Sequence, residues 1–126
     1  LPALRALLVE DDEAVGRLLA RLLERAGLRV TTAASGDAAI AQLESDSELA
    51  LLVTDMVLPG RAQGAEVVRH ARDQRPEMPI LVLTGYAEDA SLLTGGSADA
   101  VLTKPARREL LLETIERIIR ERSAAP

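Results

Sequence analysis

The chain alternates short apolar runs with longer segments in which apolar residues recur every three or four positions. The short runs predict β-strands at residues 4–9, 28–33, 49–54, 79–83 and 98–103. The longer segments predict helices at residues 13–26, 36–43, 64–75, 88–93 and 107–122. This strict alternation of strand and helix indicates an α/β fold built on one parallel sheet.

Two of the strand patterns indicate where those strands lie in the sheet. Residues 49–54 are nearly all apolar, as expected of a strand that is covered on both faces. Residues 28–33 alternate the polar Arg29 and Thr31 with apolar neighbours, which predicts an edge strand. Because crossovers between parallel strands are right-handed, we expect helices on both faces of the sheet and therefore three layers.

Residue types at the predicted helix ends support this division of the chain. Gly27 follows the first helix and suits a left-handed C-terminal cap, and Ser35 precedes the second helix as a candidate N-cap. The first helix carries an apolar stripe that we expect to be mostly core, formed by Val15, Leu18, Leu19, Leu22, Leu23 and Ala26.

The composition narrows the classes of function. The chain has no cysteine and a single histidine, which excludes disulfides, thiolate metal sites and a histidine-based zinc site within one chain. A net charge of −5 with dispersed basic residues argues against nucleic-acid binding. No apolar run approaches the ~18 residues of a membrane span, so we expect no membrane contact and a cytoplasmic location. We expect residues 1–126 to form a single domain that is excised from a longer protein.

Acidic and polar residues gather where the predicted strands end. Residues 10–12 are Glu-Asp-Asp after the first strand, Asp55 follows the third, Thr84 ends the fourth and Lys104 ends the fifth. The carboxyl ends of parallel strands share one edge of the sheet, and ligands bind there. Carboxylates crowded at one point repel one another unless a cation compensates. Without Cys or His partners, these oxygen ligands suit Mg²⁺.

Each of these residues also has a purely structural explanation. Adjacent acids after a strand often cap a helix, Thr84-Gly85 is compatible with a turn, and Lys104-Pro105 is compatible with a strand exit that opens a helix. The coincidence of four strand ends is what favours a functional site.

Over essentially its whole length, the chain resembles the response-regulator receiver family of two-component signalling systems. The matching segments are Val-Glu-Asp-Asp at 9–12, Val-Thr-Asp-Met-Val-Leu-Pro-Gly at 53–60, Leu-Val-Leu-Thr-Gly at 81–85 and Ala-Asp-Ala-Val-Leu-Thr-Lys-Pro at 98–105. The resemblance implies a flavodoxin-like (βα)5 three-layer sandwich with parallel strand order 2-1-3-4-5. It also implies a phosphoacceptor domain that catalyses its own phosphorylation and dephosphorylation and is not a stand-alone enzyme.

The same resemblance implies which residues hold the phosphoryl group and the metal. Asp55 is expected to accept a phosphoryl group from a phosphohistidine of a histidine kinase or histidine phosphotransfer domain. Mg²⁺ is expected to be bound by Asp55, by the backbone carbonyl of Val57, and by Asp11 or Asp12. Of these two acids, we expect Asp12 to bind the ion directly and Asp11 to bind it mainly through water.

Lys104 and Thr84 are implied as the groups that bind phosphoryl oxygens, with a cis peptide between Lys104 and Pro105. General chemistry agrees, because phosphoryl transfer depends mostly on in-line positioning and charge neutralisation, and a carboxylate is a suitable nucleophile. The family usually has an aromatic residue three positions before the lysine, where this chain has Val101. Valine cannot swing a ring inward, so Tyr86 is a candidate to take over part of that switch or to cover the pocket.

Val57 and Tyr86 are also the side chains expected to control water access to the phosphorylated Asp55. The phosphodonor is expected to dock on the first helix near Val15, Leu18 and Leu19. Whether the domain forms a homodimer stays open.

The long Leu-Pro-Gly-Arg-Ala-Gln-Gly loop at 58–64 and the Thr-Gly-Tyr-Ala at 84–87 resemble receivers at the C-terminus of hybrid sensor histidine kinases. A regulator with an output domain is the competing context.

Three other functions compete with this interpretation. An aspartyl-phosphate phosphatase would need an acid at position 57, which is Val57, and a longer chain. A flavin-binding domain would need a Ser/Thr-rich phosphate loop and aromatic residues around the ring. A pseudo-receiver, used only for protein binding, would usually have lost the acids or the lysine, which this chain retains.

Overall fold

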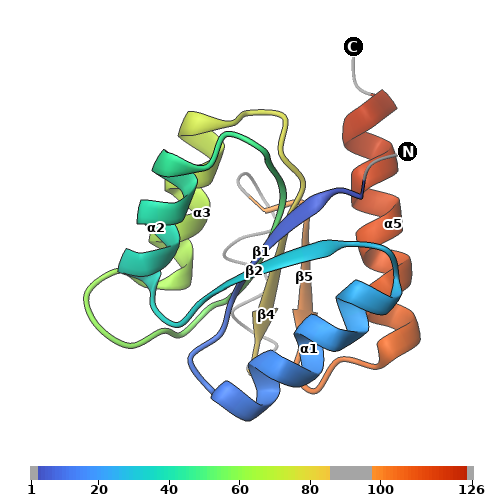
Figure 1. Cartoon of the computed structure of the whole chain (residues 1–126), viewed down its shortest axis with the longest axis horizontal. Coiled ribbons are helices and arrows are strands. Elements are labelled where there is room, and N and C mark those ends of the chain that lie inside the picture. The colour runs from blue at the N-terminus through green and yellow to red at the C-terminus, as the bar shows by residue number, and fades with distance from the viewer. Residues whose placement is uncertain (1–2, 86–97, 125–126) are drawn as a thin grey trace.

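The computed structural model describes residues 3–85 and 98–124, and its strands form one parallel sheet (Figure 1). The strands are β1 (Arg5–Val9), β2 (Arg29–Ala33), β3 (Leu49–Asp55), β4 (Ile80–Thr84) and β5 (Ala100–Thr103). Their order is β2-β1-β3-β4-β5. The expected flavodoxin-like order is confirmed, and so is the position of β2 at an edge.

The helices within the described residues are α1 (Glu13–Arg25), α2 (Gly36–Ser45), α3 (Gly64–Gln74) and α5 (Arg108–Ala124). The helix predicted at residues 88–93 lies outside the described part of the chain. Helices α1 and α5 cover one face of the sheet, and α2 and α3 cover the other (Figure 1). The three layers are therefore confirmed. None of the described helices is both long enough and apolar enough to cross a membrane.

Both predicted helix caps are confirmed. Gly27 has a φ of 100°, a conformation that L side chains rarely adopt, and the next N–H, that of Leu28, donates to Leu23 at 3.1 Å. The hydroxyl oxygen of Ser35 accepts the N–H of Ala38 at 3.1 Å. These local signals are readable from sequence because each depends only on residues within one turn.

Aliphatic side chains fill the two cores on either side of the sheet. On the α2–α3 side, Val67, Val68 and Ala71 are fully buried, as the periodicity of α3 predicts. On the other side, the predicted inward positions of α5 include the buried Leu111 and Ile115. Among the described residues, the buried members of both cores are Ala, Val, Leu and Ile with Met78, which follows from the near-absence of aromatic residues in the sequence.

The apolar stripe of α1 is wider than the surface that the helix buries. Among the stripe residues only Leu23 is fully buried, whereas Leu18 is 66% exposed. The small Gly16 is buried instead, and a side chain there would meet the stem of Glu10. The expectation that the stripe is mostly core is therefore wrong at the exposed Leu18 and Ala26. The helix buries the side that carries Gly16 and Leu23, and Leu18 lies about 200° around the helix from Gly16.

An ion-pair network joins α3, β4 and α5 at the end of the sheet away from the strand C-termini. Asp99, just before β5, accepts hydrogen bonds from the Ile80 N–H at 2.8 Å and from Arg72 at 2.9 Å. Its other carboxylate oxygen accepts from Arg122 at 2.7 Å. One partly buried carboxylate thus satisfies a backbone donor and two guanidinium groups.

We expect Asp99→Ala to lower the free energy of unfolding by about 2–3 kcal/mol, because it leaves the Ile80 N–H without its acceptor and removes the carboxylate that pairs with Arg72 and Arg122. Urea denaturation measures this change. The exposed acid Asp73 on α3 is the matched control, and Asp73→Ala should change stability by less than about 0.5 kcal/mol. Equal losses in the two variants would contradict the structural role of the network.

Candidate functional site

Asp55 is the last residue of β3 and lies at the centre of the carboxyl edge of the sheet. Its strand lies between β1 and β4, so Glu10, which follows β1, and Thr84, which ends β4, come from the neighbouring strands. The register pairs Val9 with Thr54, which brings the ends of β1 and β3 level. The Asp55 side chain is only 6% exposed. A carboxylate is therefore buried where three strand ends meet.

Lys104 reaches this carboxylate from the end of β5. Its Nζ lies 2.7 Å from Asp55 Oδ1 and 3.1 Å from Glu10 Oε1. The backbone N–H of Lys104 donates to the Thr84 carbonyl at 2.7 Å, which links the ends of β4 and β5. The expected cis peptide between Lys104 and Pro105 is present. The structure thus brings Lys104 beside Asp55, while its role toward a phosphoryl oxygen stays a prediction.

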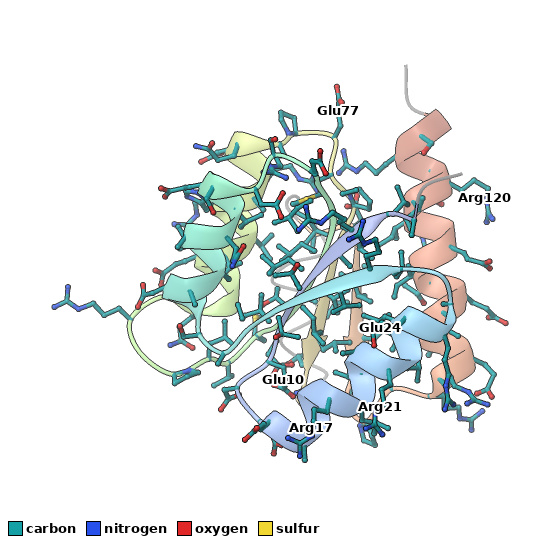
Figure 2. All side chains as sticks on the ribbon, in the orientation of Figure 1. Glu10, Arg17, Arg21, Glu24, Glu77 and Arg120 are labelled. Atoms are coloured by element: carbon teal, nitrogen blue, oxygen red, sulfur yellow. The ribbon has the colours of Figure 1, made fainter. Side chains whose placement is uncertain are left out.

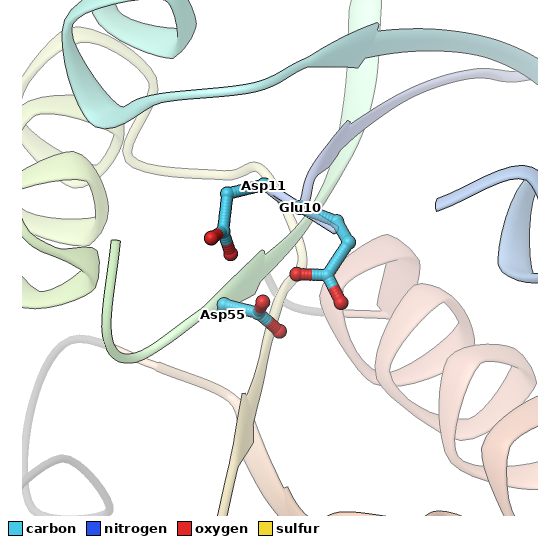
Figure 3. Close-up of side chains that lie close together, drawn as sticks. All are labelled: Glu10, Asp11 and Asp55. Atoms are coloured by element: carbon cyan, nitrogen blue, oxygen red, sulfur yellow. The ribbon is translucent and has the colours of Figure 1, made fainter. Parts of the chain in front are cut away.

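Three carboxylates meet at this point, from Glu10, Asp11 and Asp55. One oxygen of each lies within 4.8 Å of the others. Figure 3 shows the side chains of Glu10 and Asp11, consecutive in the chain, directed toward Asp55 at the end of β3. Glu10 and Asp55 are buried, whereas Asp11 is exposed, so the cluster opens to solvent on the Asp11 side.

Burial and a hydrogen bond with Glu10 raise the pKa of Asp55 from 3.8 to about 7, against the opposing effect of Lys104. Burial alone would also raise the pKa of Glu10, but its hydrogen bonds with Asp55 and Lys104 outweigh burial and lower that pKa. Burial disfavours the charged form of Lys104, yet its hydrogen bonds with Asp55 and Glu10 raise its pKa. Without metal, a proton that the acid pair holds at pH values up to about 7 therefore lies mainly on Asp55.

Asp12 lies differently from the sequence expectation. Its carboxylate is the N-cap of α1 and accepts the N–H of Val15 at 3.1 Å. This side chain is engaged by the helix end and is not one of the three clustered carboxylates, so the direct metal contact expected of Asp12 stays a prediction, and the structure offers Glu10 and Asp11 as the clustered acids instead. The residue that sequence reasoning missed as a site residue is Glu10. The signal was available, because the acid immediately before a helix is the one expected to cap it.

The remaining predicted site residues are placed only in part. Thr84 is 1% exposed at the end of β4, beside Asp55. The Val57 side chain is 65% exposed, as befits a residue expected to contribute its backbone carbonyl. Val101 is partly buried against the core on the α2–α3 side. Tyr86 lies outside the described residues, so its expected roles in switching and water access stay predictions.

The ligand atoms of the cluster suit a hard divalent cation. All three clustered ligands are carboxylate oxygens, and no N–H of the described residues donates to the buried oxygen Glu10 Oε2. A buried carboxylate oxygen without such a donor is costly unless a cation or proton satisfies it. Mg²⁺ prefers oxygen ligands and keeps part of its water shell, which the exposed Asp11 side allows.

Comparison with known proteins places these residues in a family. The response regulator receiver domain family matches residues 6–116 of the chain. The transcriptional regulatory protein AfsQ1 of Streptomyces coelicolor is 36% identical over 116 residues, which cover 90% of this chain and 50% of AfsQ1. The response regulator receiver protein CpdR of Brucella abortus is 34% identical over 120 residues, which cover 91% of this chain and 96% of CpdR.

A similar solved structure is that of the response regulator protein TrrA from Thermotoga maritima in complex with Mg²⁺-BeF. It superimposes with a TM-score of 0.83 at 28% identity, and the match covers 90% of this chain and 97% of that one. The chain spans about half the length of several of the curated relatives that it matches, AfsQ1 among them.

The raised pKa of Asp55 predicts how stability depends on pH in the metal-free protein. Between the ordinary value of 3.8 and the folded value of about 7, the folded state holds a proton that the unfolded state has released. The contribution of Asp55 to stability is therefore complete below the lower value and is lost as the pH rises through about 7. Asp55→Asn lacks this titration, so its stability relative to wild type should increase over this window. Urea denaturation in EDTA at a series of pH values tests this, and parallel profiles would contradict it.

The adjacent acids Asp11 and Asp12 allow a matched test of the metal ligands. We expect Asp11→Asn to weaken Mg²⁺ binding by about tenfold or more, because it removes a charged oxygen from the cluster. Asp12→Asn removes the same charge but keeps a good N-cap, so the free energy of unfolding should stay close to that of wild type. Its Mg²⁺ affinity should stay within about threefold of wild type. Isothermal titration calorimetry measures the affinities. If Asp12→Asn loses the metal and Asp11→Asn keeps it, the assignment from the structure is wrong.

Proposed function

This chain belongs to the response regulator receiver domains of two-component systems, and from that premise we propose that it accepts a phosphoryl group on Asp55. The observation that carries this proposal is the 2.7 Å contact between Lys104 and a buried carboxylate at the end of the central strand. The adjacent carboxylates of Glu10 and Asp11 support it, since they suit a cation beside the reacting group.

In the proposed reaction, an Asp55 carboxylate oxygen attacks the phosphorus of a phosphohistidine. The new O–P bond forms as the P–N bond breaks in line with it, and the imidazole leaves and takes up a proton. Lys104 lies where it can neutralise charge on an oxygen of the transferring group, and Thr84, at the end of the neighbouring strand, is the proposed hydroxyl donor to another oxygen. Little else is required, because such transfer depends on position and charge more than on covalent assistance.

The proposed metal is Mg²⁺, held by Glu10, Asp11, Asp55 and the backbone carbonyl of Val57. The bound ion would supply positive charge that keeps the Asp55 carboxylate ionised and stabilises the phosphoryl oxygens. The cluster of carboxylate oxygens supports this assignment, as does the Mg²⁺-BeF complex of the similar protein TrrA.

Receiver domains interact with histidine kinases or phosphotransfer proteins, and for this chain we propose that the donor docks on α1. Leu18 is an exposed apolar side chain on this helix, and Val15 is partly buried beside it. Arg17 and Arg21 project from the same helix away from the sheet (Figure 2). An apolar residue flanked by basic ones suits a partner helix that carries a phosphohistidine, and such a partner would place this domain in the cytoplasm.

The pseudo-receiver is the alternative in which the fold serves only as a binding module. The retained acid cluster and the Lys104 ion pair argue against it, because a pure binding surface has no need of buried carboxylates with a raised pKa. Among the curated relatives, names such as transcriptional regulatory protein favour a regulator over a hybrid kinase as the context of the whole protein.

We expect acetyl phosphate and Mg²⁺ to label the wild-type protein on a single residue, and Asp55→Asn to lose at least about 99% of that label while staying folded. A phosphate-affinity gel and intact-protein mass measurement detect the label, and circular dichroism checks the fold. Full labelling of Asp55→Asn would contradict the proposal, as would a wild type that takes up no label.

The docking surface is tested in the same system with a phosphorylated histidine kinase or phosphotransfer domain as donor. Leu18→Glu should slow transfer from the protein donor by about tenfold or more, because it places a charge in an apolar contact, yet leave labelling by acetyl phosphate unchanged. Glu24→Gln, at an outer position later on α1, is the control. Equal loss in both assays would mean that Leu18 acts on the fold and not on the partner.

A further inference from the structure

The segment between β3 and α3 is bridged by the side chain of Gln63. Its Oε1 accepts the N–H of Leu58 at 2.9 Å, and its Nε2 donates to the carbonyl of Gly60 at 3.1 Å. This segment begins one residue after Asp55 and includes Val57, the proposed carbonyl ligand. A surface amide therefore fixes the backbone next to the phosphorylation site.

Gln63 bridges the loop instead of capping α3, which is the more common role of a residue at its position. It is the N-cap residue of α3, yet its side chain makes no capping hydrogen bond to the helix. An Asn, Asp or Ser at this position would typically contribute about 1 kcal/mol by capping. The Gln63 amide reaches back to the loop instead, and both of its described hydrogen bonds are made there.

Tight packing fixes both ends of the segment, and in its middle the side chain of Leu58 is buried in the core while that of Val57 is exposed. A Cβ at Gly64 would lie 2.2 Å from the Asp55 carbonyl oxygen, and one at Gly36 would lie 2.1 Å from that of Ala62, so backbones touch directly at these points. Val57 between them has a largely exposed side chain, which does little to orient its own peptide groups. The buried Leu58 side chain fixes one end of the Val57–Leu58 peptide, and the hydrogen bond to Gln63 fixes the direction of its N–H.

The chemistry of the peptide unit links Gln63 to the metal site. The Leu58 N–H and the Val57 carbonyl belong to the same peptide group, and among the described bonds only Lys104-Pro105 is cis. In a planar trans peptide, the N–H and C=O point in opposite directions. Anchoring the Leu58 N–H on Gln63 therefore directs the Val57 carbonyl oxygen away from Gln63 and sets the plane in which it lies.

We propose that Gln63 is a positioning residue that orients the Val57 carbonyl for Mg²⁺ through its hydrogen bond to the Leu58 N–H. The inference rests on the proposed function, since the metal site is part of it. Gln63 touches neither the acid cluster nor Lys104 in the described structure. It acts as an outer partner of a ligand, and such partners typically change metal affinity by about 10–100-fold.

The test compares Mg²⁺ affinity of the unphosphorylated protein by isothermal titration calorimetry in wild type, Gln63→Met and Gln63→Glu. Methionine keeps the length of the side chain but neither hydrogen bond, so we expect Mg²⁺ binding about tenfold weaker or more. Glutamate keeps an acceptor for the Leu58 N–H and should retain affinity within about threefold of wild type. Gln74→Met, at the exposed far end of α3, is the matched control and should bind as wild type does.

A second measurement separates positioning from a general structural role. Amide hydrogen exchange of Leu58 should accelerate in Gln63→Met and stay slow in Gln63→Glu and Gln74→Met. Gln63→Met that loses stability or Leu58 protection, yet binds Mg²⁺ as tightly as wild type, would overturn the proposal. Failure of the proposed function is distinguishable, because wild type itself would then bind no Mg²⁺ or take no label on Asp55.

Discussion

The ion pair between Lys104 and Asp55 is the interaction on which the rest of the site depends. Removing a carboxylate from water costs several kcal/mol, and a cation at 2.7 Å in a partly buried site returns an amount of similar size. Here a second acid, Glu10, lies beside the first, and the pKa of Asp55 near 7 shows that burial and Glu10 together outweigh Lys104. A single ammonium is thus insufficient for two buried carboxylates. The arrangement favours any further positive charge, and for this reason it suits a divalent cation.

The strand order makes this ion pair achievable only by a long side chain. β5 lies two places from β3 in the sheet, with β4 between them. Neighbouring strands are about 4.8 Å apart, so a group on β5 must span about 10 Å to reach Asp55. Lysine has the length to approach it, and its backbone N–H donates to the Thr84 carbonyl at the end of β4. The fold therefore fixes both the origin and the direction of the cation.

The parts of the molecule that depend on local patterns could be predicted from the sequence. Strand and helix positions, the Gly27 and Ser35 caps and the edge position of β2 follow from periodicity and from residue types within one turn. The convergence of Asp55 and Lys104 could also be predicted from the sequence, because the carboxyl ends of parallel strands lie at one edge of the sheet.

Side-chain direction at chain reversals could not be obtained in the same way. Glu10, Asp11 and Asp12 are consecutive acids, and only the start of α1 decides that Asp12 caps the helix while the other two face Asp55. The exposure of Leu18 depends on which side of α1 packs inward, here the side of Gly16 and Leu23, and the wide apolar stripe does not decide this. The role of Gln63 could not be predicted for the same reason, since its two hydrogen bonds depend on the shape of the loop and not on residue spacing.

The contacts at this site also limit how a new anionic group on Asp55 could affect the outer strand β5. Val101 on β5 is partly buried against the α2–α3 core, and a valine has no ring to move between inward and outward positions. Within the described residues, the side chain that connects β5 to Asp55 is Lys104, whose backbone is joined to Thr84. Lys104 contacts Glu10 and Asp55 at once, so a new anion on Asp55 would compete with Glu10 for the same ammonium. Because the Glu10 carboxylate is buried, losing that contact has a free-energy cost that a cation at the proposed site would offset. In the proposed site, metal binding and the position of Lys104 would therefore be coupled through Glu10, which belongs to the acid cluster and contacts the lysine.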